Sequence, residues 1–552
     1  MMKRWLLCAA LSAALPLALA EGPATLPDMG SSAGELLTPA QERTYGGMML
    51  RQLRGYGLVL EDPLLNGYIQ SLGYRLASRS DRPSQPFTFF LMRDRQINAF
   101  ATIGGYVAVN AGLILTAERE DELAAVLAHE ISHVTQRHVL RAVEQAQRDQ
   151  LPIMLGMLGA VLAASQSDSG EGVQAAIMGG MALMQQRQIN YTRSNEYEAD
   201  RIGIQTLARS GYEPVAMADF FGRMERQMRG NLGGAQTPEY LRSHPVSTTR
   251  ISEAKARAKQ IGVGTACRRT NDGTEILSTN LDNDCTPLPA PRPVRNPLLP
   301  DYVAAGIDDT SVSHDLFALA RERVRVLSAV TPTAAMHEYQ RQLQADETAF
   351  TPAQRYGLAL AQSLAGQTEA AGEELARLAT RYPSLYWVTL AQGENDHRAG
   401  NRKSARERYE TLLRERPQNR AIVLSYATSL AEIGTPEAAR TAQELLRPLL
   451  AVEPDDPALQ RSFARASEVA GDTVRAAEAY AEVAWLNGRA DDALGQLERL
   501  RKTPDLDFYQ RSRIDARIAA ITPDALELRR ENRRGASARL DAAVSLNPHT
   551  LR

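Results

Sequence analysis

Residues 123–138 read LAAVLAHEISHVTQRH. The HEISH pattern at 129–133 is the part of the sequence from which the surrounding fold can best be predicted. His129 and His133 stand four residues apart, so on a helix their rings project from one face about one turn apart. That spacing suits two nitrogen ligands of a tetrahedral zinc ion. Glu130 is rotated by about 100° from His129 around the helix. It can therefore stand beside an attacking water and act as general base without binding the metal.

The helix that bears this motif is expected to be buried, because its other faces are apolar. Two histidines and a glutamate in a protein core need partners, since unpaired polar groups there are costly. A metal ion supplies those partners, and we expect one Zn²⁺ per chain. The apolar positions are Leu123, Val126, Leu127, Ile131 and Val134.

A third ligand is expected from NEYEADRIG at 195–203. Glu196 and Asp200 are four apart and share a helix face, whereas Glu198 falls on the other side. We predict Glu196 as the third ligand. Asp200 has two candidate roles: it can hydrogen-bond a ligating histidine nitrogen and fix its tautomer, or it can help to protonate the leaving group.

The segments around the motif predict a small sheet and further helices. Residues 87–93 (FTFFLMR) are β-prone, and a strand at 106–109 is entered through two glycines. Residues 111–145 are predicted to be helical. The apolar runs at 151–164 and 173–184 are both shorter than the ~20 residues of a membrane-spanning helix. We favour a buried helical hairpin there; the alternative is a mobile element that covers a groove or makes peripheral contact with a membrane.

A proline-dense stretch, CTPLPAPRPVRNPLLP at 285–300, cannot continue a helix and predicts an extended spacer. We place a linker at 285–305, between a metallopeptidase domain at 21–284 and a helical domain at 306–552.

The C-terminal domain repeats with a period near 34 residues, which resembles the tetratricopeptide repeat. Each unit is expected to be a helix pair that cannot bury its apolar face alone, so neighbours stack into an α-solenoid. The punctuating glycines are Gly366, Gly400, Gly434 and Gly471, and the prolines are Pro383, Pro417 and Pro454. The four expected units are 351–384, 385–418, 419–455 and 456–490, with degenerate flanking units at 310–345 and 491–548.

The N-terminal stretch, MMKRWLLCAALSAALPLALA at 1–20, has a basic start, an apolar run and small residues at its end. These features predict a cleaved signal peptide and a location in the bacterial periplasm, whereas an uncleaved anchor helix would need a longer run. Cys267 and Cys285 would then be the cysteines of the exported chain and are candidates for a disulfide. With 63 basic and 65 acidic residues, the chain gives no electrostatic reason to expect nucleic acid as a partner.

HEISH with a downstream EYEAD resembles the HtpX-like and Oma1-like zinc metallopeptidases, whose pattern is His-Glu-x-x-His followed by Glu-x-x-x-Asp. With the signal peptide and the repeats, the whole chain resembles the β-barrel assembly-enhancing proteases of the periplasm. This resemblance implies a gluzincin-type fold, mainly α with a small β-sheet. It implies zinc held by His129, His133 and Glu196, with Glu130 as base and Asp200 as an additional active-site carboxylate.

The resemblance also bears on His244, in RSHPVSTTRI at 242–251. In the family, a histidine in such a segment lies near the metal. It can block the water position as a fourth ligand, or it can stabilise the oxyanion; the alternative is an exposed loop histidine. His138, nine residues after His129, is expected on the opposite helix face in a structural role. In this peptidase class an extended substrate pairs with an edge strand, for which 98–109 is well placed; the alternative is an ordinary core strand.

Two functions follow from these observations. The first is a periplasmic zinc endopeptidase, and a chaperone as well, that degrades outer-membrane β-barrel precursors or assists their assembly. Its repeats would dock those precursors or the β-barrel assembly machinery. The second is a non-proteolytic scaffold or chaperone in which the metal site is structural.

Overall fold

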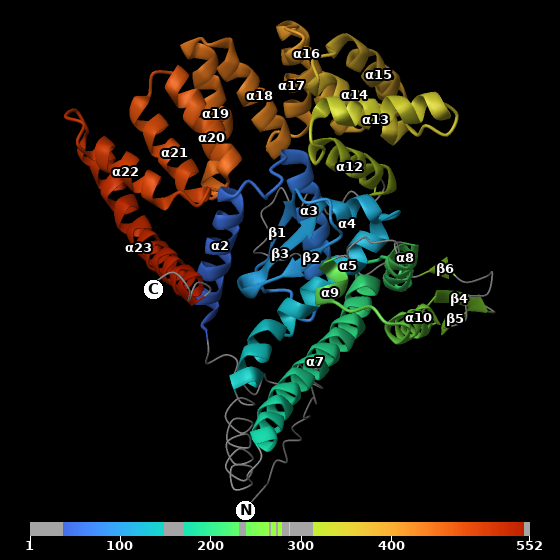
Figure 1. Ribbon diagram of the computed structural model, residues 1–552. Helices are drawn as coiled ribbons and strands as arrows, with labels where there is room; N and C mark the ends of the chain where they lie inside the picture. Colours follow the sequence, from blue (N-terminus) through green and yellow to red (C-terminus); the bar gives the residue numbers. More distant parts are fainter. Residues whose placement is uncertain are drawn as a thin grey trace, which may run out of the picture.

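The computed structural model describes residues 37–147, 170–230, 239–263, 267–271, 274–278, 286–287 and 313–545. The fold is mainly helical with a small sheet and a long C-terminal array of helices, as the sequence predicts (Figure 1). The predicted signal peptide at 1–20 lies outside the described residues.

The small sheet lies directly beside the helix that carries HEISH. Strands β1 (Thr88–Met92) and β3 (Tyr106–Asn110) are parallel, and β2 (Ala99–Ala101) pairs with β3 in the antiparallel sense. The order is β1-β3-β2, so within the described residues β2 forms an edge of this sheet. A single 3₁₀ turn, η1 (Ile103–Gly105), leads into β3.

The HEISH helix, α5 (Glu120–Thr135), lies in the centre of the peptidase and is buried over nearly its whole length. Three acidic residues in its first turn interact favourably with the positive end of the helix dipole. It contacts β2 and the surrounding helices, which are α3 (Pro63–Ala77), α7 (Gly170–Arg209) and α8 (Ala216–Gly230).

The prediction of one continuous helix over 111–145 is wrong. The chain forms α4 (Ala111–Thr116), then α5, and then a third helix at 138–147. The second break occurs at Arg137, which has a φ of 56° and binds Glu42 on α2 (Pro39–Gly55). Neither break contains glycine or proline, the residues by which a sequence ordinarily marks the end of a helix.

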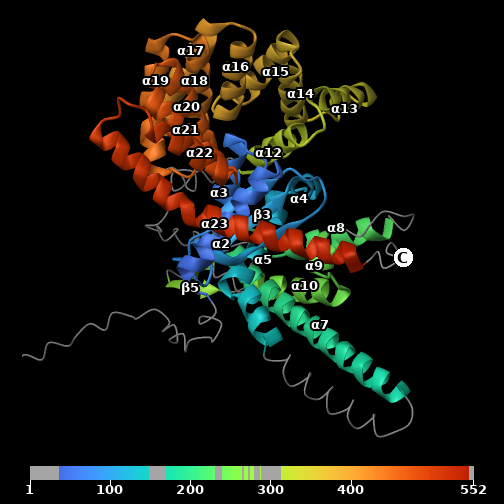
Figure 2. The ribbon, with the colours of Figure 1, turned by 60° about the vertical axis from the view of Figure 1, so that its left-hand side comes forward.

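Helix α7 extends away from the body of the peptidase at its N-terminal end (Figures 1 and 2). The apolar run at 151–164 lies outside the described residues, and the run at 173–184 falls within α7. Met178, the residue of that run whose burial is described, is 64 % exposed, so burial is the wrong expectation at this position. In the described part of the chain, no helix is both long and apolar enough to cross a membrane.

The polar segment after α10 (Thr248–Val263) forms a second small sheet. Strand β4 (Cys267–Asn271) pairs with β5 (Thr274–Ser278) and β6 (Thr286–Pro287). Strand β6 occupies the first residues of the predicted linker, while 288–312 lies outside the described residues. Cys285 also lies outside them, so the disulfide to Cys267 stays a prediction.

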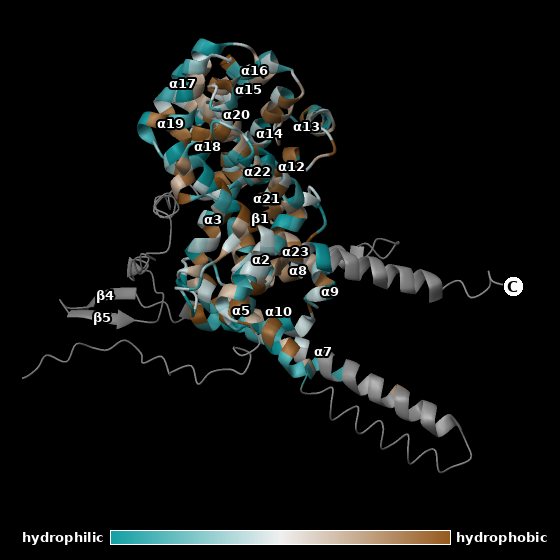
Figure 3. Cartoon of the chain, turned by 90° about the vertical axis from the view of Figure 1, so that its left-hand side faces the viewer, coloured by the Kyte–Doolittle hydropathy of each residue, from teal (hydrophilic) through white to brown (hydrophobic). Residues whose placement is uncertain are grey.

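The C-terminal helices stack as consecutive antiparallel pairs, and each of the four expected repeat units contains one pair. The glycines that recur at the repeat period all have φ between 80° and 84° and lie between the two helices of a pair. Hydrophobic and hydrophilic residues are mixed along these helices, as expected when one face of each is buried (Figure 3). The helices are α12 (Ser313–Leu327), α13 (Pro332–Ala345), α14 (Pro352–Leu364), α15 (Thr368–Arg381), α16 (Tyr386–Arg398), α17 (Arg402–Glu415), α18 (Arg420–Ile433), α19 (Pro436–Val452), α20 (Pro457–Val469), α21 (Thr473–Leu486), α22 (Ala490–Arg501) and α23 (Phe508–Ser545).

The array makes polar contacts with the peptidase near both of its ends. Near its start, α12 lies against α3 and α4, where buried Arg323 donates to both carboxylate oxygens of Asp62 at 2.8 and 2.7 Å. The same carboxylate caps α3 by accepting from the backbone N–H of Leu65. Near its end, Arg51 of α2 lies over the ring of Trp485 and binds Asp524. Both ends of the array therefore make specific polar contacts with the peptidase.

The Arg323–Asp62 pair provides a test of this junction. Arg323→Ala leaves a buried carboxylate without its counter-charge, and we expect a loss of about 3–5 kcal/mol in stability. The measurement is the midpoint of thermal unfolding of the full chain. The matched control is Arg406→Ala, which removes an exposed ion pair with Glu410 on the array and should leave the midpoint unchanged. Equal midpoints for the Arg323 variant and wild type would contradict the inferred role of this pair.

Candidate metal centre

The three predicted metal ligands come from two helices that cross in the core. His129 and His133 lie on α5, and Glu196 lies on α7. The two helices approach closely at Gly203, where a Cβ atom would stand 3.2 Å from the backbone of His129. A larger residue at this position would push α7, and with it Glu196, away from the histidines.

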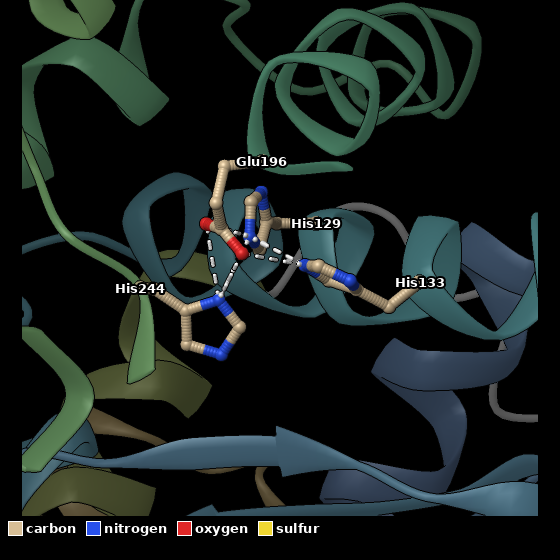
Figure 4. A group of neighbouring side chains, drawn as sticks. All are labelled: His129, His133, Glu196 and His244. Atoms are coloured by element: carbon tan, nitrogen blue, oxygen red, sulfur yellow. Dashed lines mark hydrogen bonds and ion pairs between the residues drawn. The ribbon is translucent and has the colours of Figure 1, made fainter. Parts of the chain in front are cut away.

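The donor atoms of these residues point at a common centre (Figure 4). The Nε2 atoms of His129 and His133 are 3.0 Å apart, and each lies 3.4 Å from an oxygen of Glu196. Ligands about 2.1 Å from a tetrahedral ion stand roughly 3.4 Å from one another. The spacing of the three side chains therefore fits a zinc ion.

His244 joins this group. Its Nδ1 lies 2.9 Å from Glu196 Oε1 and 3.4 Å from His129 Nε2, and the four donor atoms all lie within 4.8 Å of one another. It is only 8 % exposed, so the alternative of an exposed loop histidine is wrong. Its ring stacks on that of Tyr240, and its backbone N–H donates to the Tyr240 carbonyl. These contacts hold His244 at the end of the short helix α9 (Glu239–Ser243).

Glu130 lies beside the donor atoms and is 1 % exposed. Its Oε1 has no hydrogen-bond partner among the described residues, and His244 Nε2 is 3.7 Å away. A buried carboxylate oxygen without a partner is costly. The carboxylate is thus available to accept a hydrogen bond from a water or substrate beside the donor atoms.

Asp200 lies behind the ligands. Its Oδ1 is 3.0 Å from His129 Nδ1, and both of its oxygens accept hydrogen bonds from Arg250 at 2.7 Å. Burial would raise the pKa of Asp200, but Arg250 and His129 outweigh it and lower the pKa below its ordinary value. A carboxylate held as an anion fits the role of orienting His129 better than that of donating a proton.

Arg250 is a residue of the site that the sequence motifs do not single out. It binds Asp200, lies 3.0 Å from Glu196 Oε2 through Nη1, and donates to the backbone carbonyl of Pro245. It therefore connects Glu196 and Asp200 of α7 to the segment that carries His244. The sequence does contain a signal, because Arg250 is the single Asp, Glu, Lys or Arg in the stretch 243–252.

The expectation that His138 lies on the face opposite the site is wrong. His138 Nδ1 lies 2.9 Å from His133 Nδ1, and His138 Nε2 lies 3.2 Å from Glu198 Oε2. The expectation assumed that α5 continues past residue 135. The turn at Arg137 instead brings the His138 ring back beside His133, and Glu198 is thereby joined to the site as well.

The charges of the metal-free cluster differ between its two helix-borne histidines. Burial alone would lower the pKa of His129, but Asp200 and Glu196 raise it to about 10. Burial and the nearby charge of His129 hold the pKa of His133 well below its ordinary value. Burial would raise the pKa of Glu196, but hydrogen bonds to His129 and His244 lower it.

Comparison with known proteins also indicates a peptidase. Residues 63–258 match Peptidase family M48. The β-barrel assembly-enhancing protease of Escherichia coli K12 is 45 % identical over 244 residues, which cover 44 % of this chain and 49 % of that protein. This match therefore spans about half the length of that relative. The mitochondrial metalloendopeptidase OMA1 of Saccharomyces cerevisiae is 32 % identical over 157 residues, 28 % of this chain and 41 % of that protein.

A longer match comes from the β-barrel assembly-enhancing protease of Yersinia pestis. It is 31 % identical over 493 residues, which cover 89 % of this chain and 90 % of that protein. The similarity thus includes the helical array as well as the peptidase. This chain belongs to the M48 metallopeptidases, in the family of the β-barrel assembly-enhancing proteases.

Proposed function

We propose that this chain is a zinc endopeptidase of the periplasm that degrades outer-membrane β-barrel precursors and also assists their assembly. The observation that carries the enzymatic part is the group formed by His129, His133 and Glu196, with buried Glu130 beside it. The carboxylate and imidazole donors are those that zinc takes in catalytic sites. The periplasmic location rests on the signal-peptide pattern at 1–20 and on the names of the relatives.

Zinc, when held by these three side chains, supplies Lewis acidity that polarises a peptide carbonyl and acidifies water. Glu130 accepts the proton of the attacking water and delivers it to the nitrogen of the leaving amine. Asp200 holds the Nδ1 side of His129, so that Nε2 stays directed at the metal position. Arg250 keeps Glu196 and Asp200 in place.

Strand β2 is the proposed docking edge for substrate. It lies at the side of the sheet away from β1 and contacts α5. An extended segment that adds to this edge would form backbone hydrogen bonds, which read little of the substrate sequence. The sheet edge could then bind unfolded segments of many β-barrel precursors. Selectivity would come from the helical array, which would dock the precursor or the β-barrel assembly machinery.

His244 is proposed as the element that keeps the site closed. Its Nδ1 stands among the ligand atoms and its Nε2 faces Glu130, so the ring fills the space between the metal position and the base. Substrate cleavage would require this ring to move. This closed geometry also favours the second candidate function, a scaffold or chaperone that rarely cleaves.

Zinc binding should release a proton. Below pH 10 the metal-free protein carries a proton on His129, and this proton must leave before Nε2 can bind zinc. We expect about one proton released per ion at about pH 7, and an apparent affinity that rises about tenfold per pH unit up to about pH 9. Calorimetry in buffers of different ionisation enthalpy measures the release. Asp200→Asn should reduce this proton release, because loss of the Asp200 carboxylate lowers the pKa of His129. A heat of zinc binding that does not depend on the buffer would contradict proton release from His129.

Glu130→Gln separates the two candidate functions. The variant retains a polar side chain but has no base, so cleavage of an unfolded outer-membrane protein should fall by about 10²–10⁴-fold. Zinc content and partner binding should stay at the wild-type level, as they should in the control Glu415→Gln on an exposed position of the array. If Glu130→Gln cleaves normally, another residue is the base. If wild type cleaves no substrate yet aids assembly, the chaperone alternative is correct.

His244→Ala tests the closed state. If the ring blocks the site, its removal should raise cleavage of an unfolded substrate by about thirtyfold or more, the change expected when at most about one molecule in thirty is open in wild type. Steady-state rates of the zinc-loaded protein measure this, with Arg242→Ala as an exposed neighbouring control. A lower rate would instead show that His244 stabilises the oxyanion.

A further inference from the structure

We propose that His138 is a positioning residue that holds His133 in the orientation needed to bind the metal, through a relay that ends on Glu198. The inference rests on the proposed function, because it assigns His133 as a zinc ligand. It gives a role to two further residues, His138 and Glu198, whose side chains are not among the donor atoms that face the metal position.

The relay consists of two consecutive contacts, and an arginine binds the carboxylate at its end. His133 Nδ1 lies 2.9 Å from His138 Nδ1, His138 Nε2 lies 3.2 Å from Glu198 Oε2, and Arg141 donates to the same oxygen at 3.0 Å. His138 is 3 % exposed, whereas the Glu198 side chain is 25 % exposed. The relay thus runs from the buried ligand toward the surface.

The positions of the nitrogens determine where the protons lie when zinc is bound. His133 directs Nε2 at the metal position, so its proton is on Nδ1 and needs an acceptor. The atom within reach is His138 Nδ1, which must then be bare. The proton of His138 therefore lies on Nε2, and the Glu198 carboxylate accepts it. Each donor in the relay has one acceptor.

The two histidine ligands are supported differently. Asp200 contacts His129 directly, whereas His133 reaches its carboxylate through a second imidazole. The added ring spans the distance from α5 to the outer side of α7, where Glu198 lies. It can do so because Arg137 has a left-handed φ and turns the chain back at that point.

A role for His138 as a further metal ligand does not fit. Its Nδ1 faces the Nδ1 of His133, which is the nitrogen on the side of that ring away from the metal position. The rings meet edge to face, with centroids 4.8 Å apart. A purely structural role, in which His138 only fills space, is the alternative that the experiment must separate.

The test measures zinc affinity of the full chain by competition with a chromophoric chelator, and the visible absorption of the cobalt-loaded protein. His138→Phe keeps a ring but removes the acceptor, and we expect zinc affinity to fall by about 10–100-fold, with an altered cobalt spectrum. His138→Asn places an amide oxygen where Nδ1 stood and should restore most of the affinity. The matched control is His397→Phe, which removes another histidine–carboxylate pair, with Glu432 on the helical array, and should change neither readout.

Glu198→Ala covers the case in which His138→Phe fails to fold. Glu198 is partly exposed, so we expect its removal to leave the thermal stability of the metal-free protein unchanged while zinc affinity falls. If folded variants of His138 and Glu198 lose thermal stability but bind zinc as tightly as wild type, their role is structural and the proposal is overturned. If wild type itself binds no zinc, the proposed function fails instead, so the two failures are distinguishable.

Discussion

The buried ion pair between Arg250 and Asp200 is the interaction on which the site depends. Asp200 and Glu196 lie one turn apart on α7, both almost completely buried, and two uncompensated carboxylates there would repel each other and cost several kcal/mol each. Arg250 binds both, and its contact with the Pro245 carbonyl also fixes the segment that carries His244. One guanidinium therefore contacts the predicted ligand Glu196, the Asp200 carboxylate behind His129 and the segment that carries His244.

The elements that carry the site differ in part from those that contact the helical array. The predicted ligands lie on α5 and α7, with His244 after α9, whereas the array contacts the peptidase most through α3 and α4, and less through α2 and α5. The partner docking proposed for the array and the chemistry proposed for the site would thus depend on largely different helices. The polar contacts at both ends of the array resist its displacement from the peptidase.

Much of the site follows from helix periodicity, which sequence records directly. The four-residue spacings of His129 with His133 and of Glu196 with Asp200 each place two side chains on one face, and the small sheet and the paired repeat helices are likewise visible from local pattern. The roles of Arg250 and His138 depend instead on tertiary packing. His138 contacts His133 only because Arg137 takes a left-handed conformation, stabilised by Glu42, which is 95 residues away in the sequence.

The closed geometry proposed for His244 is favoured by only a few kcal/mol. Moving His244 away breaks its hydrogen bond to the Glu196 carboxylate, and a bond of this type contributes about 1.5–3 kcal/mol. The stacking of His244 on Tyr240 adds a further contribution of about 0.5–1.5 kcal/mol. This total is similar to the free energy that several backbone hydrogen bonds would contribute when a substrate strand adds to β2. Under the proposed function, substrate binding at the sheet edge would supply the free energy that opens the site, and the protein would stay closed until a suitable extended chain binds.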